Sequence, residues 1–375
     1  MRNPSLTTLE ENYLFEEIAA RARSYPKEEL LNLGIGDTTL PLQSSIVHAF
    51  EKAAHELGDP TAYSGYESSF GRTGLREAIA KTIYKGTVDP DDIFVSDGSK
   101  CDIARLQQLF SSDCSVAIQD PSYPAYIGAS KISGKDKIHF MPCTPENNFS
   151  PAPVDADLIY LCSPNNPTGH VMSHEELARF VAFASQKQSI LIFDSAYSAF
   201  IQDPTLPRSI YEIEGSKQVA IETGSFSKTF GFTGVRLGWL VIPKELTFAD
   251  GHSVRKDWIT IASTCFNGAS NLAQAGGVAA LLEATPAAVR HYMQQASLLK
   301  KSIPLPVYGG ENAPYLWVDL QGRSSWAVFD ELLQRDKIIT TPGVGFGPSG
   351  EGFLRLSAFA KPEHIRKAME MNALY

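Results

Sequence analysis

The sequence predicts an α/β protein: a large domain with a mainly parallel, mixed sheet between helices, and a smaller α+β domain. Two observations carry this prediction. Between about residues 75 and 245, short runs of β-branched and apolar residues alternate with helical periodicity, which is the pattern of parallel strands joined by helices. After about residue 275 the chain changes to long helical segments with isolated strands between them. A chain of 375 residues, 43% of them hydrophobic, is long enough for two such domains.

The domain boundaries are expected near these changes of pattern. We expect residues 1–45 to form an N-terminal arm and part of the small domain, residues 46–275 the large domain, and residues 276–375 the small C-terminal domain. No long Gly/Ser linker separates the halves, so the two domains are expected to share an interface.

The elements of the large domain follow from the spacing of apolar residues. A helix is expected over 75–86, where Leu75, Ile79 and Ile83 recur at helical spacing. A second helix is expected within 96–110, and a third over 175–187, where Ser173 and Glu176 have the spacing of a capping box. Apolar runs predict strands in DDIFVSDG (91–98), SVAIQ (115–119), DLIYLC (157–162), SILIFD (189–194), QVAIET (218–223) and RLGWLVI (236–242).

The small domain has fewer and longer elements. Residues 276–301 are predicted to be helical, and SWAVFDELLQR (325–335) is predicted to form another helix. APYLWVDL (313–320) and GFLRLSAF (352–359) are predicted strands.

Composition limits the classes of partner. The formal net charge is −9 and no Lys/Arg-rich block occurs, so a nucleic-acid or anionic membrane surface would have to form against the overall field. No run approaches the roughly 18 apolar residues of a membrane span. The five cysteines are an odd number without a Cys-x-x-Cys pair, which fits a reducing compartment, and we interpret them as core or near-core thiols. We therefore expect a cytoplasmic protein with a small-molecule partner and with neither a nucleic-acid nor a membrane partner.

Distinctive polar residues follow several predicted strands, where open α/β sheets have their ligand crevice. Ser99 and Lys100 begin a helix after a glycine turn, so backbone N–H groups there suit a phosphate, although this stretch taken alone favours an ordinary turn with a serine cap. Asn166 precedes a proline, which favours an extended backbone with the amide pointing into the crevice; Asn-Pro turns are also common. Asp194 ends a buried strand shortly before Tyr197, and this carboxylate either pairs with a cation or proton donor or caps the next helical segment.

Lys228 is the most informative residue of the chain. It follows a strand in GSFSKTFGFTGVR (224–236), with Ser225 and Ser227 before it and Arg236 after it. A half-desolvated lysine loses proton affinity and becomes a nucleophile for carbonyl groups. Two hydroxyls and a guanidinium on the same loop can hold a phosphate dianion. The phenylalanines of the loop disfavour a plain surface lysine. A reactive amine, a buried acid, a phenol, an amide and a phosphate cradle are together what pyridoxal phosphate chemistry requires.

Three other patterns are set aside. Residues 225–228 match the Ser-x-x-Lys motif of penicillin-binding proteins and β-lactamases, but the chain has no Ser-Asp-Asn or Lys-Thr-Gly motif. The glycines of 345–350 have dinucleotide-binding spacing, yet they lead into a predicted strand instead of a helix. His170 and His174 lie at a helix start, where a solvated cap is favoured over a metal site. No metal is therefore expected.

The ordered set of motifs resembles the fold-type I aminotransferases, which depend on pyridoxal phosphate, over nearly the whole chain. The set consists of Tyr123, Asn-Pro-Thr-Gly at 166–169, Asp194-x-x-Tyr197, Ser225-x-Ser227-Lys228, Arg236 and Arg355. Longer strings such as LGIGDTT, SDGSKCDIARLQ, CSPNNPTG, TCFNGASN and TTPGVGFGPSGEGF are similar to those of the LL-diaminopimelate aminotransferases of plants and some bacteria.

The resemblance implies a role for each matching residue. Lys228 would form the Schiff base with pyridoxal phosphate and shuttle a proton, Asp194 would pair with the ring nitrogen, and Tyr197 would bond to the ring's phenolic oxygen; these are the expected catalytic residues. The expected cofactor contacts are Tyr66, Ser99, Lys100, Tyr123, Asn166, Asp194, Tyr197, Ser225, Ser227, Lys228, Arg236 and Asn267. The expected substrate contacts are Tyr13, Gly36, Lys100, Tyr123, Asn166, Asn267 and Arg355.

Two further implications concern assembly and substrate. Tyr66 and Asn267 would reach the site of a neighbouring subunit, so a homodimer with shared active sites is expected. Arg355 would clamp the substrate α-carboxylate with its two-pronged fork. The reaction implied is the interconversion of LL-2,6-diaminopimelate and 2-oxoglutarate with tetrahydrodipicolinate and L-glutamate, in lysine and peptidoglycan precursor biosynthesis. A broad-specificity or aromatic aminotransferase of the same fold and a non-catalytic sensing module are the alternatives.

One stretch departs from the family. Members usually read Gly-Tyr-Gly-x-acidic-x-Gly where this chain has GYESSFG (65–71), so Ser69 holds the acidic position and the carboxylate is at Glu67. Either Glu67 recognises the distal ammonium of the substrate from a shifted loop, or the substrate range differs.

Overall fold

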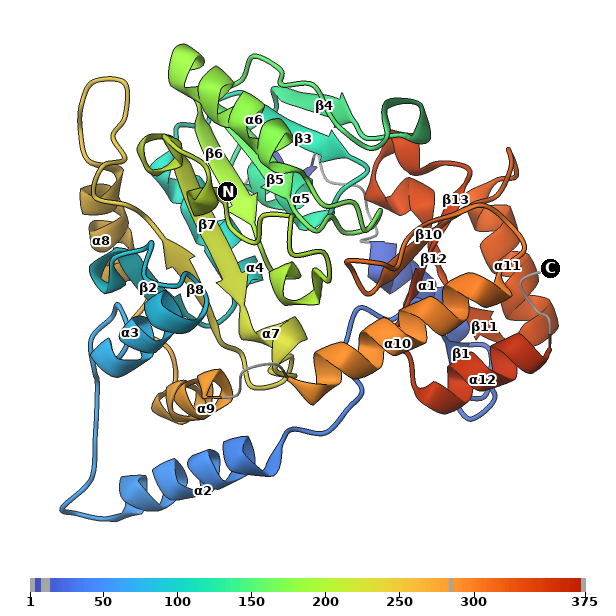
Figure 1. The fold of residues 1–375 in the computed structure, drawn as a ribbon, viewed down its shortest axis with the longest axis horizontal. Coiled ribbons are helices and arrows are strands. Elements are labelled where there is room, and N and C mark those ends of the chain that lie inside the picture. Colours follow the sequence, from blue (N-terminus) through green and yellow to red (C-terminus); the bar gives the residue numbers. More distant parts are fainter. Residues whose placement is uncertain (1–3, 8–13, 283–285, 372–375) are drawn as a thin grey trace.

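A seven-stranded sheet forms the centre of the larger part of the protein (Figure 1). The computed structural model describes residues 4–7, 14–282 and 286–371. The strands lie in the order β2 (Ile93–Ser96), β8 (Gly238–Val241), β7 (Ala220–Ser225), β6 (Ile190–Asp194), β5 (Leu158–Cys162), β3 (Val116–Asp120) and β4 (Ile138–Pro142). β8 is antiparallel to both neighbours and the other neighbouring pairs are parallel. The predicted mainly parallel, mixed sheet is confirmed.

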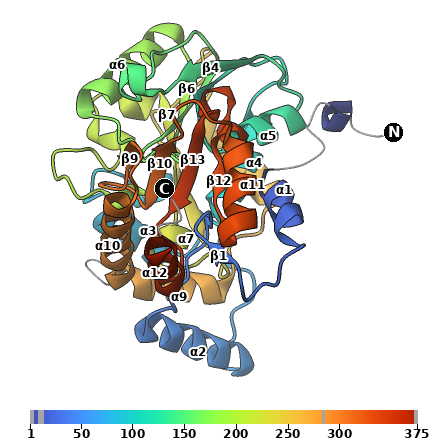
Figure 2. The same ribbon diagram turned by 90° about the vertical axis from the view of Figure 1, so that its right-hand side faces the viewer.

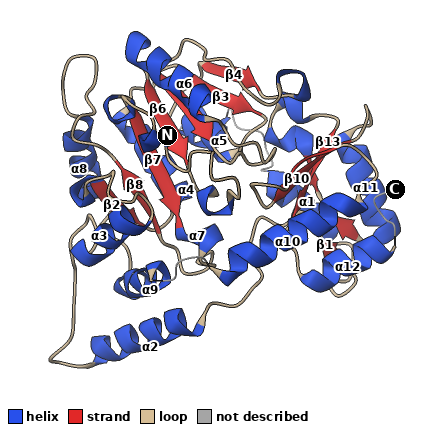
Figure 3. Cartoon of the chain, in the orientation of Figure 1, coloured by secondary structure: helices blue, strands red, loops and turns tan. Residues whose placement is uncertain are grey.

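Helices cover both faces of this sheet, as Figure 3 shows. The strands are apolar at successive positions because alternate side chains enter two different cores. One core contains the inward faces of α3 (Thr73–Thr82), α6 (His174–Lys187) and α9 (Asn271–Leu281). The other contains those of α4 (Ser99–Leu106), α5 (Ala125–Ile132) and α8 (Val254–Cys265). The capping box predicted at the start of α6 is present: Ser173 N–H donates to Glu176 Oε2 over 2.7 Å, and Glu176 N–H donates to Ser173 Oγ over 3.2 Å.

A smaller sheet lies beside the first one in the part of the chain after residue 286 (Figures 1 and 2). It is antiparallel, with the order β12 (Thr341–Pro342), β13 (Phe353–Ser357), β10 (Tyr315–Asp319) and β9 (Val307–Gly309). A short parallel pair joins β1 (Leu31–Asn32) to β11 (Ile338–Ile339). The helices here are α10 (Ala287–Ser302), α11 (Ser325–Asp336), α12 (Pro362–Glu370) and the N-terminal α1 (Leu14–Ala22).

One hydrophobic core joins the N-terminal segment to this smaller part. Leu14 and Ile18 of α1 and Leu31 of β1 pack in the same cluster as Trp317 and Phe329. We therefore propose the domain division expected from the sequence, in which residues 1–45 contribute to the small domain, residues 46–275 form the large one and residues 276–375 complete the small one. Helix α9 crosses the proposed boundary at 275.

Several elements differ from the expectation. The helical stretch predicted over 276–301 is two helices, α9 and α10, and the second begins after Pro286, whose extended backbone (ψ 131°) caps it. β4 was not predicted because it is an edge strand with mostly exposed or half-buried side chains and thus has little apolar signal. Helix α2 (Ser44–Gly58), also not predicted, extends from the body and packs on α9 (Figure 1). Cys265 is exposed, so it is not a core thiol as interpreted; it ends α8 at the surface. No helix in the described ranges has both the length and the apolar character that a membrane span requires.

Candidate active site

A cavity of about 380 Å³ lies where the parallel strands of the large sheet end, facing the smaller part of the protein. It brings together every predicted site residue except three. These twelve lining residues are Gly36, Ser99, Lys100, Tyr123, Asn166, Asp194, Tyr197, Ser225, Ser227, Lys228, Arg236 and Arg355. Since they come from both sheets and from the N-terminal segment, the site forms only when the chain is folded.

Lys228 is held at the wall of this cavity by the end of β7. The strand runs directly into the single-turn helix α7 (Phe226–Thr229), where Ser225 Oγ accepts a hydrogen bond from Ser227 N–H over 3.1 Å. The Lys228 amine donates to the carbonyl oxygen of Gly36. Burial lowers the pKa of Lys228 to about 8; the Asp37 carboxylate opposes this shift, and the Arg355 guanidinium adds to it. A lysine in this state can act as a nucleophile near neutral pH.

Asp194 ends β6 on the floor of the cavity. Its Oδ1 accepts from Ala196 N–H over 3.0 Å, and its Oδ2 accepts from the Tyr126 hydroxyl over 2.8 Å. Burial raises the pKa of the Asp194 carboxyl, and the bonds from Tyr126 and Ala196 oppose that shift. The carboxylate therefore has a proton donor as partner, as one interpretation expected. It bonds within the turn that follows it, but it does not cap the next helical segment, Ser198–Phe200, whose N-cap residue is Tyr197.

Arg355 of β13 reaches across from the small sheet. Its Nη1 donates to Asn166 Oδ1 and its Nη2 donates to the Gly34 carbonyl, each over 2.8 Å. The guanidinium carbon lies 4.3 Å from the ring centroid of Tyr315 and 4.9 Å from that of Phe346. Arg355 Nε is buried and has no hydrogen-bond partner among the described residues. A buried, unsatisfied cationic donor at a cavity wall is suited to a carboxylate ligand.

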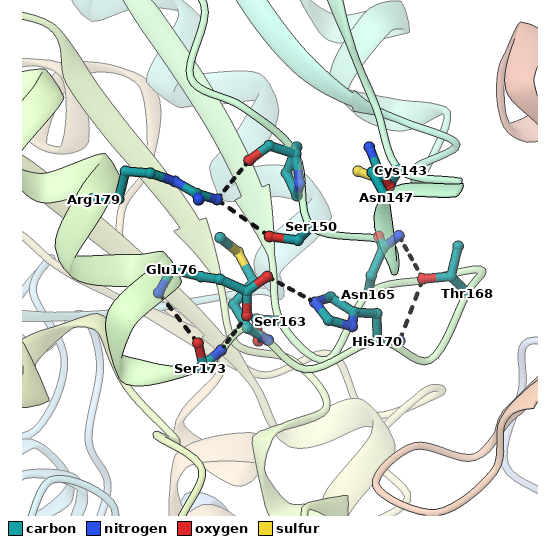
Figure 4. Close-up of polar contacts among 12 residues, drawn as sticks. Cys143, Asn147, Ser150, Ser163, Asn165, Thr168, His170, Ser173, Glu176 and Arg179 are labelled. Carbon is teal, nitrogen blue, oxygen red and sulfur yellow. Dashed lines mark hydrogen bonds and ion pairs between the residues drawn. The ribbon is translucent and has the colours of Figure 1, made fainter. Parts of the chain in front are cut away.

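The turn that carries Asn166 is fixed by its neighbour Asn165. Asn165 Nδ2 donates to Thr168 Oγ1 over 3.0 Å, which closes the Asn-Pro-Thr-Gly turn (Figure 4). It also donates to the Pro121 carbonyl over 3.1 Å. His170 follows this turn and its Nε2 lies 3.3 Å from Glu176 Oε1 (Figure 4). His174 Nε2 lies 3.9 Å from a different carboxylate, that of Glu212. The two histidines thus contact separate acids.

The predicted phosphate cradle lies at the start of α4. Gly98 precedes this helix with φ +122°, and a Cβ there would lie 2.6 Å from Arg236 Nη2, so the turn needs glycine to admit the guanidinium. Arg236 Nη1 in turn donates to the Thr233 carbonyl over 3.0 Å and contacts Ser227 Oγ at 3.5 Å. The N-terminus of α4, the hydroxyls of Ser99, Ser225 and Ser227 and the Arg236 guanidinium therefore line one corner of the cavity.

The remaining predicted residues lie elsewhere. Tyr66 is 89% exposed and lies with Asn267 along a second groove, separate from the cavity. Tyr13 lies outside the described residues. Asn271 Nδ2 donates to Ser64 Oγ and to the Gly65 carbonyl, over 3.0 and 3.1 Å, and so joins the two loops that carry Tyr66 and Asn267.

Sequence reasoning missed part of the lining. The cavity also contains Phe15, Asp37, Tyr126, Cys162, Ala196, Thr233 and Tyr315. Tyr126 lies in the first turn of α5, only three residues after Tyr123, and this closeness in sequence could have indicated it. No local signal marks Tyr315, because its place in the cavity depends on the register of β10 against β13.

A model of the family described as aminotransferase class I and II matches residues 28–371. The chain belongs to this aminotransferase family. Its members generally depend on pyridoxal phosphate. This aminotransferase is 50% identical to the LL-diaminopimelate aminotransferase of Protochlamydia amoebophila (strain UWE25), over 98% of this chain and 96% of that protein. It is 48% identical to the chloroplastic LL-diaminopimelate aminotransferase of Arabidopsis thaliana, over 98% and 85%. The solved L,L-diaminopimelate aminotransferase of Chlamydomonas reinhardtii is 47% identical and has a TM-score of 0.94, with 99% and 97% covered.

The departure at GYESSFG has a structural counterpart in this aminotransferase. The Glu67 carboxylate accepts two hydrogen bonds from Arg72, from Nε over 2.7 Å and from Nη2 over 2.8 Å. Both side chains are about 30% exposed and Glu67 lines the groove with Tyr66. Ser69 provides no carboxylate, so Glu67 is the acid of this loop, and it is already paired within its own subunit.

Proposed function

We propose that this aminotransferase binds pyridoxal phosphate and transfers an amino group between LL-2,6-diaminopimelate and 2-oxoglutarate. The observation that carries the chemistry is the convergence of Lys228, Asp194 and the unsatisfied Nε of Arg355 on one cavity. The similarity to relatives named LL-diaminopimelate aminotransferase, over 98% of the chain, supports the substrate. The products are then tetrahydrodipicolinate and L-glutamate.

The residues present fit the cofactor. The amine of Lys228 is desolvated, and the carboxyl of Asp194 is buried with one tyrosine as partner. Gly98 leaves room beside Arg236 where a Cβ would collide, and Ser225 and Ser227 line the same corner. This donor set matches a phosphate dianion at one end and a basic ring nitrogen at the other.

Pyridoxal phosphate, when bound, supplies an electron sink for the substrate α-carbon. Lys228 would hold its aldehyde carbon and later move the proton that leaves the α-carbon. Asp194 would hold the proton of the ring nitrogen, and Tyr126 fixes the orientation of this carboxylate. Asn166 and Tyr197 would bond to the ring's phenolic oxygen, while Tyr123 would lie against the ring.

The substrate end of the site depends on Arg355. Asn166 and Gly34 hold its two terminal nitrogens, and Tyr315 and Phe346 flank its plane, so the guanidinium is fixed before any ligand arrives. A preorganised fork of this kind binds a carboxylate without paying for its own ordering. Gly36, Lys100, Tyr123 and Asn166 line the rest of the cavity and are the proposed further substrate contacts, together with Tyr13.

A homodimer with shared sites is part of this proposal. Tyr66 and Asn267 are exposed, lie on loops joined by Asn271, and stand apart from the cavity of their own subunit. These features support a role in the cavity of a second copy, where Tyr66 would reach the phosphate and Asn267 the substrate. The cytoplasmic location expected from the sequence stays a prediction.

Steady-state assays test the proposal directly. The purified protein with pyridoxal phosphate is expected to use LL-diaminopimelate with 2-oxoglutarate far better than it uses the meso isomer, aspartate, tyrosine or lysine. Lys228→Ala is the matched control, and it should lose both the visible absorbance of the bound cofactor and activity. A preference for tyrosine or for many donors would establish the aromatic or broad-specificity alternative. The pairing of Glu67 with Arg72 bears on this choice, because it occupies the carboxylate that would otherwise bind the distal ammonium of the substrate. Cofactor binding without turnover of any donor would indicate a sensing module.

A further inference from the structure

We propose that Tyr315 is a positioning residue that acts on both halves of the site, with its ring holding Arg355 and its hydroxyl orienting Tyr197. This inference rests on the proposed function, since Arg355 and Tyr197 are the groups through which it acts. Tyr315 is fully buried and lines the cavity, and no local sequence signal marks it.

The ring of Tyr315 packs against the guanidinium of Arg355. In the antiparallel pair of β10 and β13, Arg355 lies opposite Trp317, and Tyr315 is two residues away on the same face of the sheet. The guanidinium carbon is 4.3 Å from the Tyr315 ring centroid, the shortest of its ring contacts. A desolvated cation over an aromatic face is attracted to it and restricted in its motion. Tyr315 therefore contributes to the fixed orientation of the fork.

The hydroxyl of Tyr315 contacts the other half of the site. It lies 2.9 Å from the hydroxyl of Tyr197, although the two residues are 118 positions apart in the chain. Tyr197 follows the end of β6 in the large sheet, whereas Tyr315 begins β10 in the small sheet. The bond thus joins the two parts of the protein inside the cavity.

The direction of this bond follows from proton counting. A phenol has one proton to donate and can accept at its oxygen. If Tyr197 donates its proton to the phenolic oxygen of the cofactor, the proton between the two tyrosines must come from Tyr315. The order is then Tyr315 to Tyr197 to cofactor oxygen, and such chains polarise one another, so that each donor is strengthened.

Both phenols are able to donate at neutral pH. Burial raises the pKa of Tyr197 and of Tyr315, and the Arg355 guanidinium opposes this shift in each case. The other titratable group that acts on the pair is Cys162 at the end of β5, whose own pKa burial also raises. Arg355 thus acts electrostatically on both phenols, and Tyr315 contacts both Arg355 and Tyr197.

Two substitutions separate the ring from the hydroxyl. Tyr315→Phe keeps the aromatic face and removes the hydroxyl, so it should weaken the donation from Tyr197 and leave the cofactor oxygen more basic. The pH midpoint of the visible absorbance of the holoenzyme should then move upward by about 0.3 units, in the same direction as a larger shift in Tyr197→Phe. KM for 2-oxoglutarate and for LL-diaminopimelate should stay within about twofold. Tyr315→Leu also removes the ring, and both KM values should rise roughly tenfold.

Tyr211→Phe is the matched control. Its buried hydroxyl lies 3.1 Å from the carbonyl oxygens of Ala220 and Val241, which share its one proton. Tyr211 does not line the cavity, so loss of its hydroxyl should leave the pH midpoint in place. An unchanged midpoint or a downward shift in Tyr315→Phe would overturn the role of the hydroxyl, and unchanged KM values in Tyr315→Leu would overturn that of the ring. If Tyr315→Leu fails to fold, Tyr315→Phe still decides the role of the hydroxyl. Tyr315→Met then replaces Tyr315→Leu as the test of the ring. Absence of bound cofactor in the wild-type protein would instead refute the proposed function, and this inference with it.

Discussion

The lowered pKa of Lys228 leads to a direct measurement. Burial brings this pKa from 10.5 to about 8. At pH 7.5 the amine is then neutral in about a quarter of the molecules, compared with about 0.1% for a lysine whose pKa is 10.5, a difference of more than two hundredfold. Because only the neutral amine is nucleophilic, Lys228 should react with a small acylating reagent faster than an ordinary lysine at this pH, by up to this ratio.

The assay is pH-dependent labelling of the cofactor-free protein, with Lys228 quantified by mass spectrometry beside a reference peptide that contains an ordinary lysine. Labelling of Lys228 should rise with pH with its midpoint near pH 8, while labelling of the peptide lysine should have its midpoint near pH 10.5. Asp37→Asn is the matched perturbation. The Asp37 carboxylate raises the pKa of Lys228, so its removal should move the midpoint below the wild-type value. A Lys228 midpoint near 10 would refute the argument from burial.

Three further predictions concern neighbouring groups. Arg355→Lys should raise KM for both substrates by about 10- to 100-fold with unchanged circular dichroism, because a single ammonium cannot replace the fork; equal KM values would exclude Arg355 as the carboxylate clamp. Gly98→Ala should weaken cofactor binding by at least about tenfold in equilibrium dialysis, because the added Cβ would clash with Arg236 and because alanine is strained at φ +122°. Gly74→Ala is the control and should not weaken binding, since nothing lies within 4 Å of a Cβ there. Burial raises the pKa of Glu222 from 4.5 to about 7, so the folded state retains a proton that the unfolded state loses, and stability should fall by up to about 3 kcal/mol as pH rises through that window. Glu222→Gln should flatten this dependence in urea unfolding at pH 5 and pH 8, and an equally steep profile would contradict it.

The loop at residues 65–71 departs from the expected family pattern, because Ser69 stands at the position where an acidic residue is usual. Glu67 is bound by both nitrogens of the Arg72 fork, which reduces its capacity to take a second cation. The donor comparison with LL-diaminopimelate, the meso isomer and aspartate therefore examines both the proposed substrate and the consequence of having serine at position 69. This loop lies in the groove with Asn267, away from the cavity of its own subunit.

The sequence by itself determined six strands of the large sheet, namely β2, β3, β5, β6, β7 and β8, and the groups placed at their ends. Asp194 and Lys228 follow buried apolar runs directly, and each strand end in a parallel sheet lies at the same edge, so local pattern was enough to bring them to one crevice. The sequence pattern did not predict the edge strand β4 or the break between α9 and α10. An edge strand is hydrogen-bonded along one side only, and most side chains of β4 are exposed or half-buried. An apolar helical pattern can also continue across the break between two helices, here from the end of α9 at Leu281 to the start of α10 after Pro286.

Only the tertiary structure decided which side chains meet across the cavity. Arg355 bonds to Asn166 over a separation of 189 positions, and Tyr126 bonds to Asp194 over 68. Tyr315 reaches Tyr197 because the register of β10 and β13 and the docking of the two parts bring their hydroxyls together. The desolvation of Lys228 likewise comes from segments far from it in sequence, including the carbonyl of Gly36. Such contacts depend on packing between distant segments, and periodicity within one segment carries no information about them.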